Sequence, residues 1–521
     1  MNLVSERRVS RRDLAMGSAV ISLLLAALFG FAARAQAAEN LYWDNYSASP
    51  DSVSVAEITG SGGGALNLTG TVLESPEGMA YDSVTNRLFV ANEGIGLTSG
   101  QISFINLDGS GGGVFSAPGA PVEEPQGVAV DPATRMIYWF NSESNTISWA
   151  KLDGSAGGTL NTTGATIEGV RRIALDPVAG RMYWGNIGVG GSSISFANLN
   201  NTGGGNLNIA GATPPERITG LAVDPAGGRV YWVDAELEMV SFASLSGAGG
   251  GDVNPAGAVF NEPWGLSFDP SLGKLYWGNE NNGEERTNAI GVGLLAGGGG
   301  GVSPVSAPVN GPQDPVILKS PAGAGVPMLT RNAKARAQLT CSPGTWGADF
   351  PGSFVYQAPR TFAYQWTLKG TPVAGATAAT LTATKAGSYA CAVTAANQVG
   401  TASQTSAPIT VKAAKLKLTT KKKARVQPGG VATFKVKAVN QGDLKSKTAG
   451  VCVKLPKKAK KVLKAPKCKS LGKVKSRGKK TATLKIKVGK DAVGTYKVTF
   501  TVRGNPGKSA KSKIVVAAPK K

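Results

Sequence analysis

Histidine is absent from this chain of 521 residues, and cysteine occurs only four times. Without histidine, the chain lacks the commonest general base and the commonest metal ligand. The cysteines form no Cys-x-x-Cys pair, which argues against a zinc site. Glycine clusters occur at 62–64, 111–113, 203–205, 249–251 and 297–301, and no amphipathic helical segment follows any of them. These clusters are therefore predicted to be loops, because a phosphate-binding turn of the nucleotide-binding kind must open a helix.

Acidic residues are almost missing from the C-terminal part of the chain. From Lys412 onward, 34 Lys and Arg stand against only Asp443 and Asp491, a balance of +32. Residues 1–411 hold 22 basic and 31 acidic residues, a balance of −9. The overall formal charge of +23 therefore combines an acidic body with a strongly basic tail.

A strand signature recurs six times, at spacings of 45 to 49 residues. The copies are Tyr42-Trp43, Phe89-Val90, Tyr138-Trp139, Tyr183-Trp184, Tyr231-Trp232 and Tyr276-Trp277. This period suits one four-stranded propeller blade, and each copy has short β-branched and aromatic runs split by turn residues. The sequence predicts an all-β fold with a six-bladed β-propeller, followed by two β-sandwich domains.

The repeated unit resembles the YWTD repeat, also called the low-density-lipoprotein-receptor class B repeat, over about residues 41–320. In that family Tyr-Trp-Thr-Asp is followed by Ile-x-x-Ala-x-Leu-Asp-Gly-Ser. Here the third position is never Thr. The fourth position holds Asn45, Asn92, Asn141, Asn186, Asp234 and Asn279. The chain is therefore more similar to a bacterial relative than to a receptor fragment.

The first copy lacks the apolar strand that precedes the others, and the segment 312–318 reads as one such strand standing alone. We expect the two ends of the propeller to pair and so remove an exposed sheet edge. A set of aspartates begins an Asp-Pro or equivalent turn in each unit, and we interpret it as structural. The set is Asp82, Asp131, Asp176, Asp224 and Asp269.

The N-terminal residues 1–38 have the pattern of a cleavable export signal, with arginines, an apolar run from Ala15 to Ala33, and Ala35-Gln-Ala37. Ser10 to Leu14 also resembles a twin-arginine motif, which leaves the export pathway open. The sequence predicts a secreted or cell-surface protein with no transmembrane span in its mature form. We expect any retention at the surface to be by charge, since no terminal sorting signal is apparent.

After the propeller, predicted over residues 39–320, the segment 321–412 places Trp366 midway between Cys341 and Cys391, 25 residues from each. Tyr389 lies two residues before the second cysteine. This pattern resembles the immunoglobulin-like sandwich, in which a buried Trp packs against an inter-sheet disulfide. The resemblance implies a structural bridge between the two cysteines.

Residues 413–521 alternate apolar residues with Lys or Thr in three runs, which predicts strands with one wet face. The stretches 440–442 and 494–496 resemble bacterial CARDB-like β-sandwich repeats. Cys452 and Cys468 lie in this segment, and we expect them to be bridged in an oxidising compartment. The sequence therefore predicts a folded sandwich coated with lysine rather than a disordered basic tail.

Partners of propellers usually meet the mouth of the central channel, which is formed by the loops entering the innermost strands. Phase in the repeat predicts the contact residues Glu77, Gln126, Arg171, Arg172, Thr219, Trp264 and Gln313. A second loop set adds an acidic rim: Glu93, Glu143, Glu236, Glu238, Glu280, Glu284 and Glu285. The alternative is that these are ordinary charged loops and that Trp264 packs into its blade.

Catalytic and metal-ligating residues are not predicted, because the innermost strands offer Gly, Ala, Val, Leu and Met, without a repeated inward carboxylate. No cofactor is expected, although calcium on rim carboxylates and loop carbonyls stays open. The sequence favours an exported, non-catalytic binding or adhesion protein. Its propeller would recognise a protein or glycan, and its basic domain would contact an anionic cell-envelope polymer.

Several alternatives remain. The lysines could serve only solubility. The chain could be a secreted propeller hydrolase or lyase acting on a carbohydrate or lactone, or a surface protein that self-associates through its acidic and basic parts. Nucleic acid is disfavoured, because no basic stretch carries interleaved exposed aromatic residues for stacking on bases.

Overall fold

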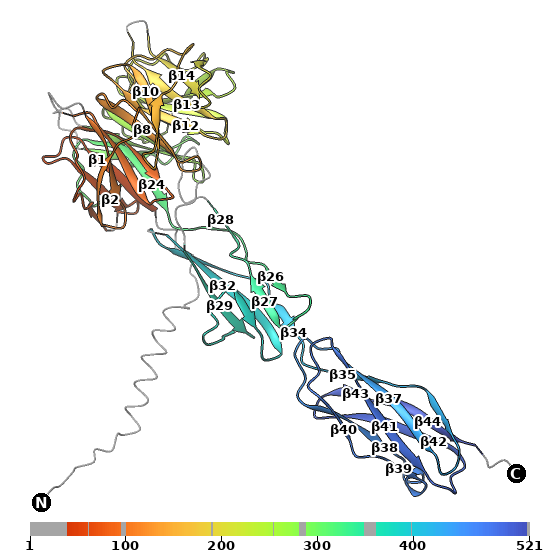
Figure 1. The fold of residues 1–521 in the computed structure, drawn as a ribbon. Coiled ribbons are helices and arrows are strands. Elements are labelled where there is room, and N and C mark those ends of the chain that lie inside the picture. The colour runs from red at the N-terminus through yellow and green to blue at the C-terminus, as the bar shows by residue number, and fades with distance from the viewer. Residues whose placement is uncertain are drawn as a thin grey trace, which may run out of the picture. The chain divides into compact units, whose positions relative to one another are not determined.

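The computed structural model describes residues 39–60, 62–94, 100–188, 191–253, 255–280, 288–347, 361–397 and 399–517. The expected export signal and the rim residues Glu284 and Glu285 lie outside these ranges. The described chain forms strands and one short 3-10 turn, η1 (Ala459–Lys461), which confirms the all-β prediction (Figure 1). None of its helical segments has the length and apolarity needed to cross a bilayer.

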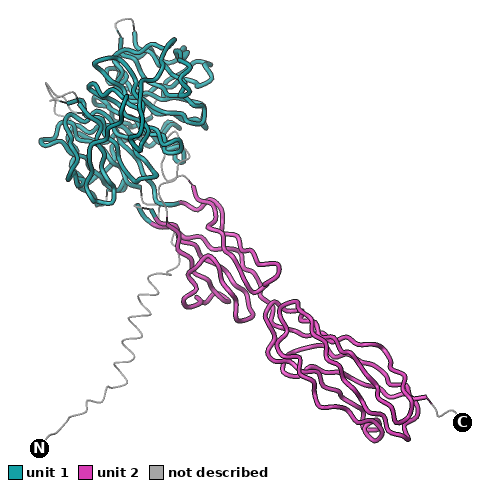
Figure 2. The backbone as a smooth tube through the Cα atoms, in the orientation of Figure 1, with its two compact units in different colours: residues 1–321, 348–359, 397–400 teal, residues 322–347, 360–396, 401–521 magenta. Residues whose placement is uncertain are grey.

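The chain divides into two compact units (Figure 2). Unit 1 comprises Met1–Pro321, Ala348–Pro359 and Asn397–Gly400. Unit 2 comprises Ala322–Gly347, Arg360–Ala396 and Thr401–Lys521.

Unit 1 contains six four-stranded antiparallel sheets in its described part, which are the blades of the predicted propeller. The first three, each given from its innermost strand outward, are β24 (Pro312–Lys319), β1 (Glu39–Asn45), β2 (Ser52–Glu57), β3 (Gly63–Ala65); β4 (Pro76–Asp82), β5 (Arg87–Asn92), β6 (Gln101–Asn106), β7 (Gly111–Phe115); and β8 (Pro125–Asp131), β9 (Met136–Asn141), β10 (Thr146–Lys151), β11 (Gly157–Thr159).

The other three blades are β12 (Ile173–Asp176), β13 (Arg181–Asn186), β14 (Ser193–Asn198), β15 (Gly204–Asn206); β16 (Ile218–Asp224), β17 (Arg229–Asp234), β18 (Met239–Ser244), β19 (Gly250–Val253); and β20 (Pro263–Asp269), β21 (Lys274–Asn279), β22 (Ala289–Leu294), β23 (Gly301–Val302). Six innermost strands, one from each blade, line a central cavity of about 130 Å³.

The predicted closure of the ring is confirmed. β24, from the end of the propeller, pairs antiparallel with β1, from its beginning, from Glu39 opposite Lys319 to Asn45 opposite Pro312. The first blade therefore takes its innermost strand from one end of the sequence and its other three strands from the other end.

The repeated Trp and Asn fix the loops that lead into the innermost strands. Trp139 and Trp184 are buried, and each indole nitrogen donates to the carbonyl of the residue 18 positions earlier, at 2.9 and 2.8 Å. The fourth-position Asn accepts a backbone N–H from the same loop. Asn141, for example, accepts from Glu123 at 3.0 Å, and Asp234 does the same for Glu216 at 2.7 Å. A side-chain oxygen acceptor is what this position requires, and both Asn and Asp supply one.

The repeated aspartates are structural, as predicted. Asp131, for example, accepts backbone N–H bonds from Ala133 and Thr134 at 3.0 and 3.3 Å, which holds the turn between the first and second strands. Asp82 also pairs with Arg135 of the following blade, at 2.6 Å.

In unit 2, the first sandwich has strands β25 (Gly323–Gly325), β26 (Leu329–Arg331), β27 (Gln338–Cys341), β28 (Thr345–Trp346), β29 (Thr361–Leu368), β30 (Thr371–Pro372), β31 (Thr380–Thr382), β32 (Gly387–Ala396), β33 (Thr401–Thr405) and β34 (Ile409–Val411). The predicted Cys341–Cys391 disulfide is confirmed, and the fully buried Trp366 packs in the same core. The Tyr389 hydroxyl donates to the Lys385 carbonyl at 2.9 Å.

The second sandwich has strands β35 (Leu416–Thr419), β36 (Lys423–Val426), β37 (Val431–Asn440), β38 (Ala449–Lys454), β39 (Leu463–Lys464), β40 (Lys469–Gly472), β41 (Lys479–Val488), β42 (Gly494–Arg503), β43 (Gly507–Lys508) and β44 (Ala510–Val516). Two five-stranded sheets enclose one core, with Phe434 and Phe500 in contact at a centroid distance of 5.1 Å. Lysines alternate outward along β37 and β41, which confirms the period-two prediction. The Cys452–Cys468 disulfide is also confirmed.

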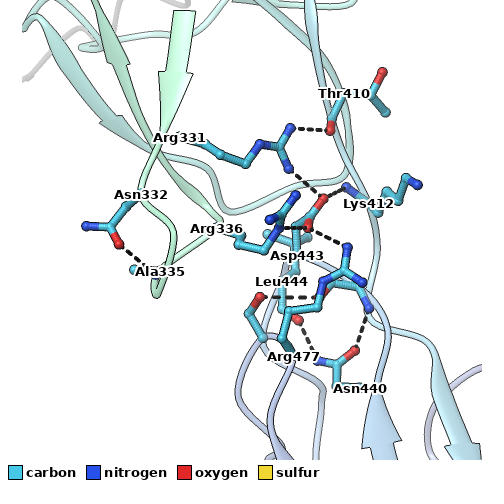
Figure 3. A network of polar contacts seen from close by, with 12 residues as sticks. Arg331, Asn332, Ala335, Arg336, Thr410, Lys412, Asn440, Asp443, Leu444 and Arg477 are labelled. Atoms are coloured by element: carbon cyan, nitrogen blue, oxygen red, sulfur yellow. Dashed lines mark hydrogen bonds and ion pairs between the residues drawn. The ribbon is translucent and has the colours of Figure 1, made fainter.

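A buried carboxylate joins the two sandwiches (Figure 3). Asp443 pairs with Arg331 at 2.9 Å and Arg336 at 3.0 Å from the first sandwich, and with Arg477 at 3.3 Å from the second. It also accepts the backbone N–H of Lys412 at 2.9 Å. These hydrogen bonds and the arginines outweigh the effect of burial and lower the pKa of Asp443 to about 2. Asp443, one of the two acids of the basic tail, therefore helps to hold the two sandwiches together.

Candidate functional site

The predicted mouth residues meet at one end of the central channel, where each innermost strand begins. The next residue along in each blade forms a ring that we call the neck: Gly78, Gly127, Arg172, Gly220, Gly265 and Asp314. Four of the blades have glycine at this position, and the other two have residues of opposite charge.

Backbone crowding explains the glycines. A Cβ on Gly220 would lie 2.4 Å from the carbonyl carbon of Gly265, and one on Gly78 would lie 2.8 Å from the Cα of Gly127. Gly127 and Gly265 also have positive φ angles, of 50° and 60°, which favour glycine. The innermost strands therefore approach one another too closely at the neck for ordinary side chains at these four positions.

The two exceptions form an ion pair with each other. Arg172 and Asp314 belong to blades that are three apart in a ring of six, so they face each other across the channel. The Arg172 Nε donates to the Asp314 Oδ1 at 2.6 Å. Both residues line the central cavity at the neck.

Three further predicted residues surround Arg172. Its terminal nitrogens donate to the Glu77 carboxylate at 3.2 Å and to the Gln313 side-chain oxygen at 2.6 Å. The half-buried ring of Trp264 lies 5.7 Å from the Arg172 guanidinium carbon, and 6.0 Å from that of Arg217. Trp264 is therefore neither fully exposed nor fully packed into its blade.

The side chains of Gln126 and Thr219 contact rim and backbone groups instead of Arg172, whereas Arg171 contacts the Arg172 guanidinium through its backbone carbonyl. Gln126 donates to Glu93 at 2.8 Å, Thr219 donates to the Pro263 carbonyl at 2.5 Å, and the Arg171 carbonyl accepts from Arg172 at 3.0 Å. Of the seven predicted residues, five are at most 5% exposed: Glu77, Gln126, Arg172, Thr219 and Gln313. Their role in binding stays a prediction, and Arg171 and Trp264 present the larger accessible surface.

More acid than base is buried at the neck. Asp44 is fully buried, and within the described part of the chain no other residue donates a hydrogen bond to either of its carboxylate oxygens; the Asp314 Oδ2 also has no partner there. Burial raises the pKa of Asp44 well above its ordinary value, Asp314 and Glu77 add to the rise, and Arg172 opposes it. Burial likewise raises the pKa of Asp314 against the influence of Arg172.

For Arg172, the neighbouring charges outweigh the effect of burial. Burial alone would lower the pKa of Arg172, but Asp314, Glu77 and Asp44 outweigh it and raise the pKa above its ordinary value. Arg172 is thus a permanent positive charge, while Asp44 and Asp314 hold protons more readily than free carboxyls do.

The acidic rim divides into two groups. Glu93 and Glu280 are half-buried beside the neck, where burial and then the nearby Glu77 raise the pKa of each. Glu143, Glu236 and Glu238 are exposed and lie on loops further out. The first group therefore lies next to the neck, whereas Glu236 of the second group pairs with Arg217 at 3.7 Å.

No protein-family model matches this chain. No curated protein matches it either. Among solved structures, the chain is similar to one from the nidogen/laminin complex, with 18% identity, 54% of this chain and 98% of that chain covered, and a TM-score of 0.41. It is also similar to a gluconolactonase from Xanthomonas campestris, with 12% identity, coverages of 60% and 92%, and a TM-score of 0.36. At these identities, neither likeness carries a function over to this chain.

A metal site is not apparent. Among the residues that the structure describes, no three Asp or Glu side chains are grouped so that they could hold a metal ion. Of the rim carboxylates that the structure describes, Glu93 and Glu280 accept hydrogen bonds from neighbouring side chains, and Glu143, Glu236 and Glu238 are exposed.

Sequence reasoning missed Asp44 and Asp314. Asp44 occupies the third position of the repeated signature, where the other copies have Ala91, Phe140, Gly185, Val233 and Gly278. Asp314 occupies the glycine position of the neck. Both are single departures from an otherwise apolar or glycine column, and that departure is the signal that would have identified them. The sequence pattern predicted no repeated inward carboxylate, and the cavity lining that the described residues form accordingly contains a single carboxylate, Asp314, from one blade.

Proposed function

We propose that this chain is an exported, non-catalytic, multidomain binding or adhesion protein. In this proposal its propeller recognises a protein or glycan at the channel mouth, and its second sandwich contacts an anionic polymer of the cell envelope. The proposal includes the finer resemblances: YWTD-like repeats in unit 1, an immunoglobulin-like domain at 321–412 and a CARDB-like domain at 413–521.

The observation that carries this proposal is that the buried arginine of the propeller neck is bonded to other protein groups, whereas the lysines of the second sandwich face solvent. At the propeller neck, Arg172 is bonded to Glu77, Asp314 and Gln313, so its donors hold the fold together. On the second sandwich the lysines of β37 and β41 point outward, and Asp443 is buried among arginines. A surface of this kind supports long-range attraction to a polyanion.

The test is co-sedimentation of the full mature chain with purified cell envelopes across a salt series. Retention is expected at low salt and should fall by roughly 0.5 M salt, where the Debye length is below about 5 Å. A chain that lacks residues 413–521 should not be retained. Sedimentation without envelopes is the control for self-association, and equal retention of the shortened chain would refute the assignment of envelope contact to the second sandwich.

A second candidate function, a propeller hydrolase or lyase, is favoured by one observation. Asp44 and Asp314 are buried acids with raised pKa values, and Asp314 lines a cavity beside a fixed guanidinium. A carboxyl with a raised pKa keeps its proton to higher pH than a free carboxyl does, which is the property required of a general acid. Turnover of lactone or glycoside substrates by the full chain, abolished by Asp314→Asn, would favour this candidate over the non-catalytic one.

A further inference from the structure

Five lysines are gathered at one end of the second sandwich. A hollow of about 460 Å³ is lined by five lysines and one glycine: Lys445, Lys473, Lys475, Lys479, Lys480 and Gly478. We call this the lysine hollow. All five lysines are exposed, and within the described residues none of their ammonium groups forms an ion pair.

Two loops are bonded together so that their lysines face the same space. Ser446 and Val474 exchange bonds: the Ser446 N–H donates to the Val474 carbonyl at 2.9 Å, and the Val474 N–H donates to the Ser446 Oγ at 2.8 Å. Both residues are buried. Each is flanked in sequence by lysines that are exposed, so pairing the two buried residues brings Lys445 beside Lys473 and Lys475.

A buried amide anchors the same loops. Asn440, which is fully buried, donates to the carbonyls of Leu444 at 2.8 Å, Val474 at 3.3 Å and Lys475 at 3.2 Å. Its oxygen accepts the N–H of Gly442 at 2.9 Å. The backbone that carries the lysines is therefore held by bonds made inside the protein, and the positive charges are brought together before any ligand arrives.

The nearest carboxylate does not neutralise this surface. Asp443 lines a neighbouring hollow, which shares Lys445 and Lys475 with the first, but it already pairs with Arg331, Arg336 and Arg477. That second hollow is also lined by Lys334 and Arg336 of the first sandwich. The cationic surface thus continues from one hollow into the next instead of ending at a single anion-sized pocket.

We propose that the lysine hollow is the binding site for a linear anionic polymer with closely repeated phosphate or carboxylate groups. The inference rests on the proposed envelope contact and assigns it to five residues. An extended occupant fits better than a single ion, because the hollow is open and its donors are five separate ammonium groups. Nucleic acid is less suited, because no aromatic side chain lines the hollow to stack on a base.

The test compares two full-length variants with equal loss of charge. The hollow variant carries Lys→Gln at Lys445, Lys473, Lys475, Lys479 and Lys480. The control variant carries Lys→Gln at five exposed lysines on β35, β37 and β41: Lys417, Lys435, Lys437, Lys485 and Lys487. Binding is measured to long-chain polyphosphate, to polygalacturonate and to inorganic phosphate, with circular dichroism as the check on folding.

The hollow variant should bind polyphosphate at least about tenfold more weakly than the parent, and the control variant within about threefold of it. The slope of log affinity against log salt should shrink by about 4 in the hollow variant, since each neutralised phosphate contributes about 0.7–0.9. The two polymers separate phosphate from carboxylate as the preferred group, and inorganic phosphate should bind far more weakly than either.

Equal weakening in both variants would overturn the hollow and leave only a diffuse charged coat, with envelope contact intact. Absence of polymer binding by the parent chain would overturn both the hollow and the proposed envelope contact. Tighter binding of single-stranded DNA than of polyphosphate, lost in the hollow variant, would also overturn the proposal and identify a nucleic-acid site.

Discussion

Replacing Arg172 by Met should severely destabilise the propeller. The side chain is 5% exposed, and among the described residues it is the cation that pairs with both Glu77 and Asp314 at the neck. Removing one partner of a buried ion pair leaves an uncompensated buried charge, which costs about 3–5 kcal/mol. In a unit of this size, that loss lowers the Tm by roughly 6–20 °C.

Asp314→Gly supplies the more discriminating half of the test. It restores the residue that four other blades have at this position and removes a positive φ of 42° from a non-glycine residue. In the parent chain it should destabilise by about 1 kcal/mol, because a charge-assisted bond is lost. In the Arg172→Met background it should stabilise, because it removes an unpaired carboxylate, and the coupling free energy should be about 2 kcal/mol.

The assay is urea unfolding of the full chain followed by tryptophan fluorescence, with near-UV circular dichroism as the check on the native fold. Arg135→Met is the matched control. Arg135 pairs with Asp82 at 2.6 Å, and its own side chain is 35% exposed. The buried Asp82 carboxylate keeps its hydrogen bonds from Val84 and Thr85 when Arg135 is replaced, so this loss should cost less than that of Arg172, about 1 kcal/mol. If Asp314→Gly changes stability by the same amount in both backgrounds, the ion pair does not hold the neck and the reasoning is refuted.

Three further predictions concern other groups. Asp443→Asn should cost unit 2 about 2 kcal/mol at neutral pH, because a pKa of about 2 lies well below the unfolded value of about 3.9; this stability is present above about pH 4 and is lost as the pH falls towards 2. Unfolding measured from pH 2 to 7 checks it, with the exposed Asp491→Asn as control, and an unchanged pH profile would contradict it. Asp44→Asn should stabilise the propeller at neutral pH, because the raised pKa of Asp44 means that the parent loses stability as the pH rises from about 4 through the folded pKa. The Tm of the variant should therefore change less with pH than that of the parent. A lower Tm for the variant than for the parent at pH 7 would count against this view. Added calcium should leave the Tm of the propeller unchanged and chelator should not lower it, because the described residues offer no group of carboxylates suited to a metal.

Much of the fold could be predicted because its determinants repeat. The paired aromatic residues, the Asp turns and the lone strand 312–318 predict six blades and a closure by both ends, and these features depend on local patterns and on period. The two disulfides could be predicted because each pair of cysteines lies in one patterned segment.

The site was harder to predict because its contacts are not local. Phase placed Glu77, Arg171 and Gln313 at equivalent positions and Arg172 at the position that is glycine in other blades. The ion pair between Arg172 and Asp314, however, spans 142 residues and joins opposite blades. The Asp443 cluster likewise depends on Arg336, which lies 107 residues earlier in another sandwich. In both cases a single charged residue departs from the local sequence pattern. Its partner of opposite charge lies far away in the sequence and can be identified only in the folded structure.

The pairing of β1 with β24 also determines when the propeller can finish folding. Trp43 donates to the carbonyl of Pro308, which lies 265 residues further along the chain. During synthesis, the unpaired side of β1 has no partner until β24 has emerged, and an unpaired strand edge invites pairing with other chains. Contacts of such long sequence separation form slowly. Ring closure is therefore expected to be a late step, and the interval before it is when the newly made chain has most need of protection from aggregation.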